Sequence, residues 1–302
     1  MKTKYLILFP ILLTLAACQR MELEDPTLKD NTYNDGDVLT LTVEATWGSV
    51  DTKALNLDGT TLKAYWVEGE QVMVFKGDTY LGALTAHPAN SSATTARLTG
   101  VITVSGLAVN DALTLLFPGR DDHNWDYTAQ NGPSSAGQDG TLATLQNKFD
   151  YAMATVAIAT INIDAITTKG SATFENQQSI YRFSFTLPNS VTVKDFEISS
   201  ANSTLVKSRT WNTSDWASAF GAIKVTPSAS SDPVYVSLRN ESITDDTYNF
   251  NITGSDDALY TASKPIGSAN LGQGKFLNTT ITGSQPSFAP ASGTITSSSE
   301  VY

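Results

Sequence analysis

An unbroken alternation of apolar and polar side chains runs from Asp37 to Trp47, and it restricts this segment to extended structure. Successive side chains of a strand point to opposite faces, so every second residue shares a face. The apolar face consists of Leu39, Leu41, Val43, Ala45 and Trp47, and the polar face of Thr40, Thr42, Glu44 and Thr46. We therefore predict a half-buried β-strand over Asp37–Trp47.

Similar short runs recur along the chain, and turn-forming pairs such as Asp58-Gly59 and Pro118-Gly119 separate them. Only the segment Asn212–Phe220 is a candidate for a short capped helix. The other predicted strands are Gln71–Phe75, Leu113–Phe117, Thr155–Ile163, Ile180–Leu187, Val191–Ile198, Val234–Leu238, Thr247–Ile252 and Phe276–Ile281. Many short strands with few helices predict an all-β fold of β-sandwiches.

The length of the chain, 302 residues, favours two domains. We predict the boundary near residue 150, where a loop-rich stretch ends and a new set of strands begins. The predicted segments are a signal peptide (1–17), a lipidated tether (18–36), an N-terminal β-sandwich (37–149), a C-terminal β-sandwich (150–283) and a tail (284–302) that could donate a strand.

The first residues have the pattern of a cleaved secretory signal. Lys2 and Lys4 precede an apolar run of 13 residues, Tyr5–Ala17, which is shorter than the roughly 20 residues that a membrane span needs. The run ends in Leu15-Ala-Ala-Cys18, which resembles the lipobox of bacterial lipoproteins, in which the cysteine thiol receives a diacylglycerol. The alternative is a plain secretory signal that happens to end at a cysteine.

Cys18 is the only cysteine in the sequence, so an intrachain disulfide is not possible. Burial of apolar side chains must therefore stabilise the fold, and a lipidated Cys18 could not serve as a catalytic thiol. We expect an anchored protein that does not cross the membrane, with the covalent lipid on Cys18 as its only non-protein group.

The chain is acidic, with a formal charge of −11. Without Lys2 and Lys4 it has 17 basic and 30 acidic residues, a charge of −13. An acidic surface repels phosphate backbones, so we expect no nucleic-acid partner. The acidic residues after Cys18 loosely resemble the surface-export signal of Bacteroidetes lipoproteins, and a solvated charge run is the equal alternative.

Candidate catalytic and metal-binding residues are sparse. The two histidines, His87 and His123, are far apart in sequence and lie in different loop contexts. The run Asp122–Asp126 imitates the start of a calcium loop, but Tyr127 and Pro133 stand where such a loop requires Gly and Glu. We expect neither a metal site nor an enzyme.

Several aromatic residues lie in polar, turn-rich surroundings, where their rings could stack on sugars. The alternative is that they close the ends of a sandwich core, because aromatic side chains bury large areas readily. These residues are Trp125, Tyr127, Trp211 and Trp216. Trp66 follows a strand-like run, and we predict that it belongs to the core.

Several stretches, in order, resemble the fimbrillin family of Bacteroidetes. The first is Asp51-Thr-Lys-Ala-Leu55 followed by Lys63-Ala-Tyr-Trp-Val-Glu-Gly-Glu-Gln-Val-Met-Val-Phe75, which is similar to the family's Thr-Arg pair, tryptophan, acidic-Gly-acidic turn and apolar strand. The others are Gly137-Gln-Asp-Gly-Thr-Leu-Ala-Thr-Leu145 with Phe149-Asp-Tyr-Ala152, and Gly274-Lys-Phe276.

The resemblance implies two tandem transthyretin-like β-sandwiches and a lipoprotein precursor that is carried to the outer membrane and cell surface. It also implies polymerisation, in which a protease trims the first strand and the C-terminal strand of another subunit fills the vacated groove. This sequence has Lys53 where the family has arginine, which places processing by an Arg-specific protease in doubt. The candidate donor segment is Phe288–Tyr302, whose apolar members on one face are Ile295 and Val301.

We therefore expect a fimbrillin-like structural or adhesive subunit of a cell-surface fimbria, anchored by lipid. Its expected partners are other fimbrial subunits, including further copies of itself, and a host or bacterial surface ligand. The alternative is a monomeric surface lipoprotein that binds a glycan or a host ligand.

Overall fold

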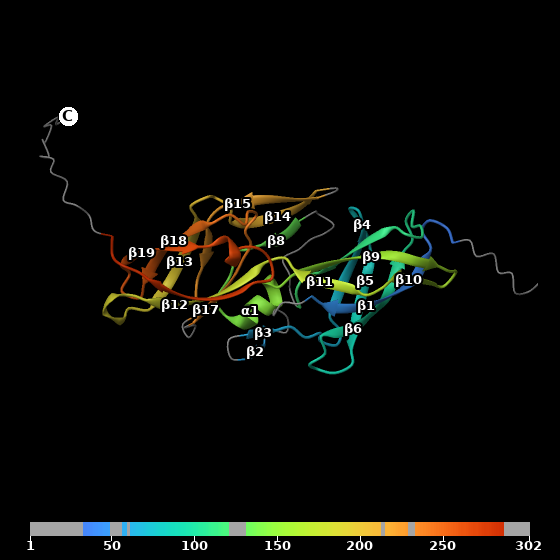
Figure 1. The fold of residues 1–302 in the computed structure, drawn as a ribbon, viewed down its shortest axis with the longest axis horizontal. Coiled ribbons are helices and arrows are strands. Elements are labelled where there is room, and N and C mark those ends of the chain that lie inside the picture. Colours follow the sequence, from blue (N-terminus) through green and yellow to red (C-terminus); the bar gives the residue numbers. More distant parts are fainter. Residues whose placement is uncertain are drawn as a thin grey trace, which may run out of the picture. The chain divides into compact units, whose positions relative to one another are not determined.

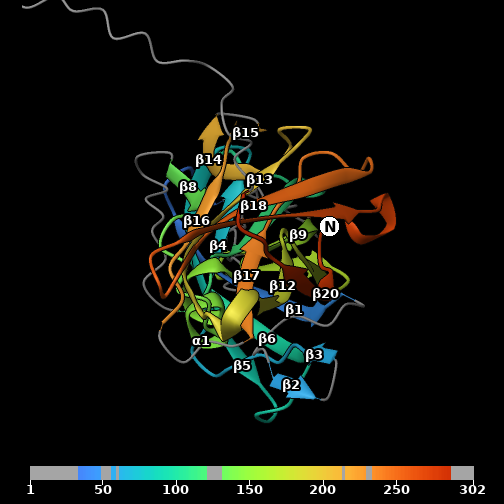
Figure 2. The ribbon, with the colours of Figure 1, turned by 90° about the vertical axis from the view of Figure 1, so that its left-hand side faces the viewer.

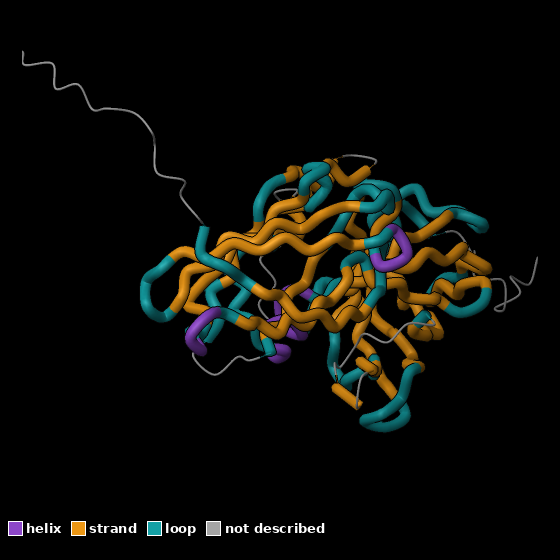
Figure 3. Tube along the Cα trace, turned by 60° about the vertical axis from the view of Figure 1, so that its left-hand side comes forward, coloured by secondary structure: helices purple, strands orange, loops and turns teal. Residues whose placement is uncertain are grey.

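The computed structural model describes residues 33–48, 56–58, 61–120, 131–212, 215–228 and 233–286, and the regular secondary structure of these residues is almost entirely strand, joined by loops (Figure 3). The helical segments are short: α1 (Leu142–Thr144), η1 (Leu145–Phe149), η2 (Pro188–Ser190) and η3 (Ser268–Asn270). The predicted all-β class is confirmed. None of the described helices has the length and apolar character that a membrane span requires.

The first and largest sheet surrounds one apolar core, which we call the first core. Its strands are β1 (Val38–Trp47), β4 (Gln71–Lys76), β5 (Thr79–Pro88), β6 (Thr95–Thr103), β7 (Ala112–Phe117), β9 (Ala152–Ile161), β10 (Ala165–Lys169) and β11 (Ala172–Asn176). The sheet order is β10-β1-β11-β9-β7-β4-β5-β6, and β1 also pairs with β6. That last pairing closes the hydrogen-bonded strands into a circuit, and β1 is the strand that closes it.

Two short strands share one position in this circuit. β10 pairs with one half of β1 and β11 with the other half, and both pair with β9 on their far side. Gly170, with a φ of +69°, lies between them. A glycine is suited to this break because a positive φ strains residues that carry a Cβ atom.

A second core lies between two further sheets. One has the order β17-β12-β20, from β17 (Val234–Leu238), β12 (Ser179–Thr186) and β20 (Phe276–Thr282); the other has the order β16-β13-β18-β19, from β16 (Ile223–Val225), β13 (Val193–Ser200), β18 (Asp246–Gly254) and β19 (Leu259–Ile266). The sheets face each other across aromatic contacts, such as Phe183 with Phe250, whose ring centroids are 5.3 Å apart. Figure 2 shows β20 beside β12.

Two small sheets complete the fold. β14 (Val206–Asn212) pairs with β15 (Asp215–Phe220) and with β8 (Asn131–Ser134), and β2 (Asn56–Asp58) pairs with β3 (Thr61–Lys63). The helix that we predicted over Asn212–Phe220 is therefore wrong. Asn212 ends β14 and Asp215–Phe220 is β15, and these two strands form an antiparallel hairpin in which Val206 pairs with Phe220. Pairing with β14 satisfies the backbone of a segment whose own helical preference is weak.

The predicted boundary at residues 149 and 150 is also wrong. β9, β10 and β11 belong to the first sheet, and buried side chains up to Phe174 belong to the first core. The preceding segment, β8 with Gln138, pairs instead with β14 and β16 of the second part. Figure 1 shows this exchange: β9 to β11 lie among β1 and β4 to β6, whereas β8 lies next to β14. The first core therefore contains chain from both sides of the predicted boundary, whereas the second core contains only residues after it and receives β8 through the small sheet of β14.

The other predicted strands are present. Val234–Leu238 coincides with β17, and each of the others overlaps the strand described above at its position. Whether the two cores have the transthyretin-like arrangement of the family stays an expectation.

Candidate strand-exchange site

The five apolar side chains of β1 all point into the first core, as the alternation predicts. Leu41 and Val43 are fully buried, and Trp47, the most exposed of the five, keeps 8% of its surface. The ring of Trp47 lies against Trp66, Phe174 and Phe117, with centroid distances of 4.6, 5.3 and 6.1 Å. The strand thus contributes an aliphatic stretch and one large aromatic anchor to the core.

Both edges of β1 are hydrogen-bonded. Along one edge it runs antiparallel to β6, in register from Val38 with Thr103 to Thr46 with Thr95. Along the other edge it runs parallel to β10 near Leu41 and parallel to β11 near Ala45. A strand that left this position would expose two rows of backbone donors and acceptors, so the vacated groove would favour the entry of another strand.

On the inward face of the sheet, the residues beside Ala45 on the two neighbouring strands restrict the size of the side chain at this position. Ala45 is in register with Ala96 of β6 on one side and with Ala172 of β11 on the other. All three are buried. Cores are close-packed, so this row accepts only a small side chain without displacement of the neighbouring strands.

The outward face of β1 continues a row of threonines that crosses five strands. The row consists of Thr160, Thr167, Thr42, Thr99 and Thr85, which are paired in register from β9 to β5. Hydroxyl oxygens approach one another within it: Thr160 and Thr167 at 2.7 Å, and Thr42 and Thr99 at 3.4 Å. Cross-strand pairs of this kind stabilise a sheet and fix its register.

Contacts at each end of β1 hold it in place. Before the strand, the amide of Gly36 donates to the carbonyl of Val104, and the amide of Val104 donates to the carbonyl of Asp37. After it, the amide of Gly48 donates to the carbonyl of Phe174 at 2.9 Å. The whole stretch from Gly36 to Gly48 would have to leave together if β1 were exchanged.

The motif that carries the family resemblance lies beside this strand. Trp66 is fully buried, which confirms its predicted place in the core. Glu70 closes the turn that Gly69 enters at a φ of +86°: its carboxylate accepts from the amide of Val67 at 3.0 Å and from Arg120 Nε at 2.9 Å. The sequence analysis did not identify the partner Arg120, because 50 residues separate it from Glu70.

Several predicted site residues lie outside the described part of the chain. They are the lipidation residue Cys18, the processing residue Lys53 and the donor residues Ile295 and Val301, together with His123, Asp122–Asp126, Trp125 and Tyr127. Trp211 and Trp216 belong to β14 and β15, where they are paired in register. The remaining histidine, His87, is exposed, and its Nδ1 lies 2.6 Å from a carboxylate oxygen of Glu68.

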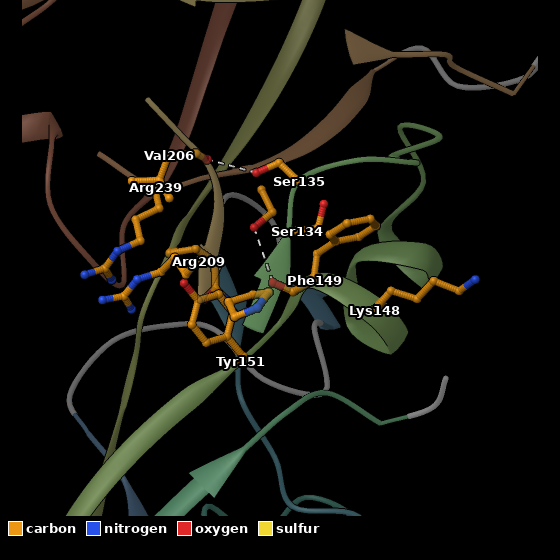
Figure 4. A pocket seen from close by; sticks show the side chains of 11 residues that line it. Ser134, Ser135, Lys148, Phe149, Tyr151, Val206, Arg209 and Arg239 are labelled. Atoms are coloured by element: carbon orange, nitrogen blue, oxygen red, sulfur yellow. Dashed lines mark hydrogen bonds between the residues drawn. The ribbon is translucent and has the colours of Figure 1, made fainter. Parts of the chain in front are cut away.

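A small cavity lies where chain from both sides of residue 150 meets (Figure 4). Its volume is about 20 Å³, enough for a water molecule and not for a sugar ring. Arg209, Arg239 and Tyr151 line it, and burial raises the pKa of the Tyr151 hydroxyl above its ordinary value. The Ser135 hydroxyl donates to the carbonyl of Val206 at 3.0 Å. This cavity is a polar packing junction rather than a binding site.

Metal-ligating side chains are scattered over the described residues. These residues contain no cluster of three or more His, Cys, Asp or Glu side chains that could hold a metal ion. A surface hollow of about 750 Å³ beside Phe185 and Val193 is lined mainly by small polar and aliphatic side chains. The ring of Phe185 packs on Phe196, with centroids 4.8 Å apart, and so belongs to the second core.

Comparison with known proteins gives distant structural similarities. No protein-family model matches the chain, and no curated protein matches it. Among solved structures, a candidate cell adhesion protein of Bacteroides ovatus aligns at 11% identity over 83% of this chain and 97% of its own, with a TM-score of 0.44. A fimbrial assembly protein of Parabacteroides distasonis aligns at 9% identity over 81% and 90%, with a TM-score of 0.40. The tip fimbrial protein Mfa3 of Porphyromonas gingivalis aligns at 10% over 75% and 81%, with a TM-score of 0.37. At these values the similarities assign neither a family nor a function to the chain.

Proposed function

We propose that this chain is a fimbrillin-like structural or adhesive subunit of a cell-surface fimbria, exported as a lipoprotein, and that β1 is the strand it exchanges with a neighbouring subunit. The observation that carries the proposal is the position of β1. It closes the circuit of the first sheet, it is paired along both edges, and it fills the first core with five side chains. The ordered resemblance of the motif around Trp66 supports the family assignment.

The energetics favour refilling of the groove after β1 has gone. Each large side chain of the strand contributes about 1.5–3 kcal/mol on full burial. Loss of Leu39, Leu41, Val43 and Trp47 together would leave an apolar groove with unpaired backbone on both sides. A subunit in that state would be marginally stable, because the folded state of a domain is favoured by only about 5–15 kcal/mol. A donor strand from another molecule would restore both the burial and the pairing.

The groove specifies the pattern of its donor. The inward positions require aliphatic residues at the places of Leu39, Leu41 and Val43, a small residue at Ala45 and a large aromatic residue at Trp47. The outward position of Thr42 lies between two threonines of the row.

The tail of this chain matches the donor pattern in part. Ile295 and Val301 are six residues apart, as are Leu41 and Trp47. In that alignment Ser299 takes the place of Ala45 and has a suitable size, but Ser297 takes the place of Val43 and is polar. The tail of a different fimbrial subunit is therefore the better donor, and a second copy of this chain is the weaker one.

The experiment compares three unlipidated proteins by their mass in solution. The first begins at Pro26 and retains β1, the second begins at Ala54, and the third begins at Ala54 and ends at residue 286. Residue 286 is the chosen end because the amide of Gly283 and the backbone of Ser284 bond to Thr186 and Thr261. We expect a monomer for the first protein, chains for the second and loss of those chains for the third.

A synthetic peptide that copies residues 36–48 provides the matched control. When added to the third protein, it should refill the groove and restore the melting temperature of the protein that retains β1. A protein beginning at Ala54 that stays monomeric, melts like the longer protein and takes up no peptide would show that β1 is not an exchangeable strand.

A further inference from the structure

The sheet of β12, β17 and β20 is one strand narrower than the sheet it faces. It has three strands, whereas the opposing sheet has four. β20 lies at its edge and pairs only with β12, parallel and in register from Ile180 with Phe276 to Thr186 with Thr282. No described segment pairs with the other side of β20. There is thus an unfilled strand position beside β20.

Neighbouring edges of the second core are closed by specific contacts. At β17, the side chain of Gln138 bonds to the amide and the carbonyl of Ser237, and the amide of Tyr235 donates to the carbonyl of Gly140. At β19, Pro265 lacks an amide hydrogen, and Thr261 exchanges two backbone hydrogen bonds with Ser284. These are devices that prevent strand addition. The pair of Ser284 with Thr261 also closes the open side of the chain just past the end of β20, so the open part of this edge is Phe276–Thr282, for which no such cover exists among the described residues.

The backbone of β20 presents alternate groups to the open side. The amide of Ile180 donates to the carbonyl of Lys275, and the amide of Gly283 donates to the carbonyl of Thr186. Odd-numbered residues of β20 therefore direct their backbone groups to β12. The backbone amides and carbonyls of the even-numbered residues point the opposite way, to the open edge. These residues are Phe276, Asn278, Thr280 and Thr282.

Two basic residues lie next to this open edge, and a third lies on β19, the strand that pairs with Ser284 just past β20. Arg182, on β12, is in register with Asn278 of β20, and Lys275 directly precedes β20. Lys264 lies on the face of β19 that also carries the buried residues Tyr260 and Ile266. None of the three forms an ion pair with a described carboxylate. Arg182 donates to the side-chain oxygen of Asn278 at 3.5 Å. In a chain with a formal charge of −11, a group of basic residues without an ion pair among the described residues marks a place for an acidic partner.

We propose that the open edge of β20 accepts, as a fourth strand, the acidic segment Met21–Asp25 of a second copy of this chain. The segment alternates apolar and acidic residues, Met21-Glu-Leu-Glu-Asp25. In extended form it would direct Met21 and Leu23 toward the second core and Glu22 and Glu24 toward Arg182. Its backbone would pair with Asn278 and Thr280.

Charge excludes the simplest alternative, a pairing of β20 with β20 of another copy. That arrangement would bring the Arg182 and Lys275 side chains of both molecules to one seam, where like charges are unfavourable. An acidic strand neutralises the same side chains. The proposal does not depend on strand exchange at β1, because the two edges belong to different cores.

The test uses the mature chain from residue 18 with Cys18→Ser, and a second version that also has Glu22→Gln, Glu24→Gln and Asp25→Asn. Amide hydrogen exchange is followed by NMR, and molecular mass is measured by sedimentation. Thr280→Pro removes an outward amide and leaves the pairing with β12, and Thr280→Val is its matched control. Melting of each variant shows that it is folded.

We call the version with Glu22, Glu24 and Asp25 the acidic chain and the version with the three substitutions the neutralised chain. At a concentration where about nine-tenths of the β20 edges of the acidic chain are occupied, the amides of Asn278, Thr280 and Thr282 should exchange about tenfold more slowly than in the neutralised chain. Thr280→Pro should abolish dimers, Thr280→Val should keep them, and a synthetic peptide of residues 19–30 should restore slow exchange in the neutralised chain. Equal exchange rates in the acidic and neutralised chains would overturn the proposal. So would slow exchange in a molecule that stays monomeric, because the segment would then be bound within its own chain.

Discussion

The indole rings of Trp47 and Trp66 lie with their centroids 4.6 Å apart at an interplanar angle of 39°. One ring belongs to the strand that closes the first sheet, and the other belongs to the motif by which the sequence resembles the fimbrillins. The contact therefore links the candidate exchange strand to the part of the chain that would remain behind. A donor that lacked a large ring at this position would leave Trp66 partly uncovered.

The first prediction concerns the contribution of this contact to stability. Trp47→Ala should lower the free energy of unfolding by about 3–5 kcal/mol, because it removes a buried ring and leaves a cavity. Thr40→Ala, on the exposed face of the same strand, is the matched control and should change it by about 0.5 kcal/mol or less. Urea unfolding at pH 7 measures both. Similar losses in the two variants would mean that Trp47 does not anchor β1.

The second prediction concerns acid stability through Asp246, a buried carboxylate of β18. Burial disfavours its charged form, but hydrogen bonds from the hydroxyls of Ser200 and Thr204, at 2.5 and 2.8 Å, and from the amide of Thr247 outweigh this cost and lower its pKa. Because the pKa is lowered in the folded state, the ionised carboxylate stabilises the fold at pH values above its ordinary pKa of about 3.9. This stabilisation is lost as the pH falls through the lower pKa of the folded state.

Asp246→Asn should therefore destabilise the protein by about 1–3 kcal/mol at pH 7, and the difference from the parent protein should shrink below about pH 4. Asp78→Asn, in an exposed turn, is the control. Urea unfolding at pH 7 and pH 3 supplies the comparison. A difference that is equally large at both values would assign the role of Asp246 to packing rather than to its charge.

The third prediction follows from the strands that cross the predicted boundary at residues 149 and 150. A fragment of residues 33–149 should fail to fold, because it lacks β9 to β11 of the first core. A fragment of residues 150–286 retains every residue of the second core and lacks only β8 and the contacts of Gln138. When mixed, the two fragments should form a native-like complex. Amide dispersion in NMR spectra distinguishes these states. A well-dispersed spectrum from the isolated 33–149 fragment would show that β9 to β11 are dispensable for the first core.

The fourth prediction concerns the N-terminus. Cys18→Ser should abolish labelling by a clickable fatty acid in cells and leave the leader uncleaved, because in the proposed lipoprotein the thiol of Cys18 is the lipid acceptor. The mass of the protein isolated from cells gives an independent reading of the same modification. Labelling that persists in the variant would place the lipid elsewhere, and a cleaved but unlabelled parent protein would indicate a plain secretory signal.

Local pattern predicted the strands well where it was strong. The alternation over Asp37–Trp47 corresponds residue by residue to the buried face of β1. The apolar run Val234–Leu238 ends where β17 ends. The hairpin of β14 and β15 has no comparable alternation, so a capping pattern was mistaken for a helix. Its structure depends on pairing with a partner strand that local sequence does not identify.

Long-range choices were not readable from the sequence. The apolar residues of Ala152–Ile161 indicate a strand, but nothing in them specifies whether that strand joins the first or the second core. The threonine row through Thr42 was unreadable for the same reason. Each threonine can be recognised as an outward residue of its own strand, but only the register between the strands places them in one row. Arg120 could not be suspected from the acidic turn, because nothing in the sequence distinguishes the buried Glu70 from the exposed Glu68.

The alanine row beside Ala45 gives the first sheet a means of rejecting a misplaced strand. A slip by one residue inverts the inside and outside faces and is costly for any alternating strand. A slip by two residues preserves the alternation, but it would drive Val43 or Trp47 against Ala96 and Ala172 and would set Thr40 or Glu44 into the place of Thr42. The small inward side chain at Ala45 and the outward hydroxyl at Thr42 thus each disfavour the same two-residue slip. An incoming donor strand must therefore match the groove in its alignment as well as in its hydrophobicity.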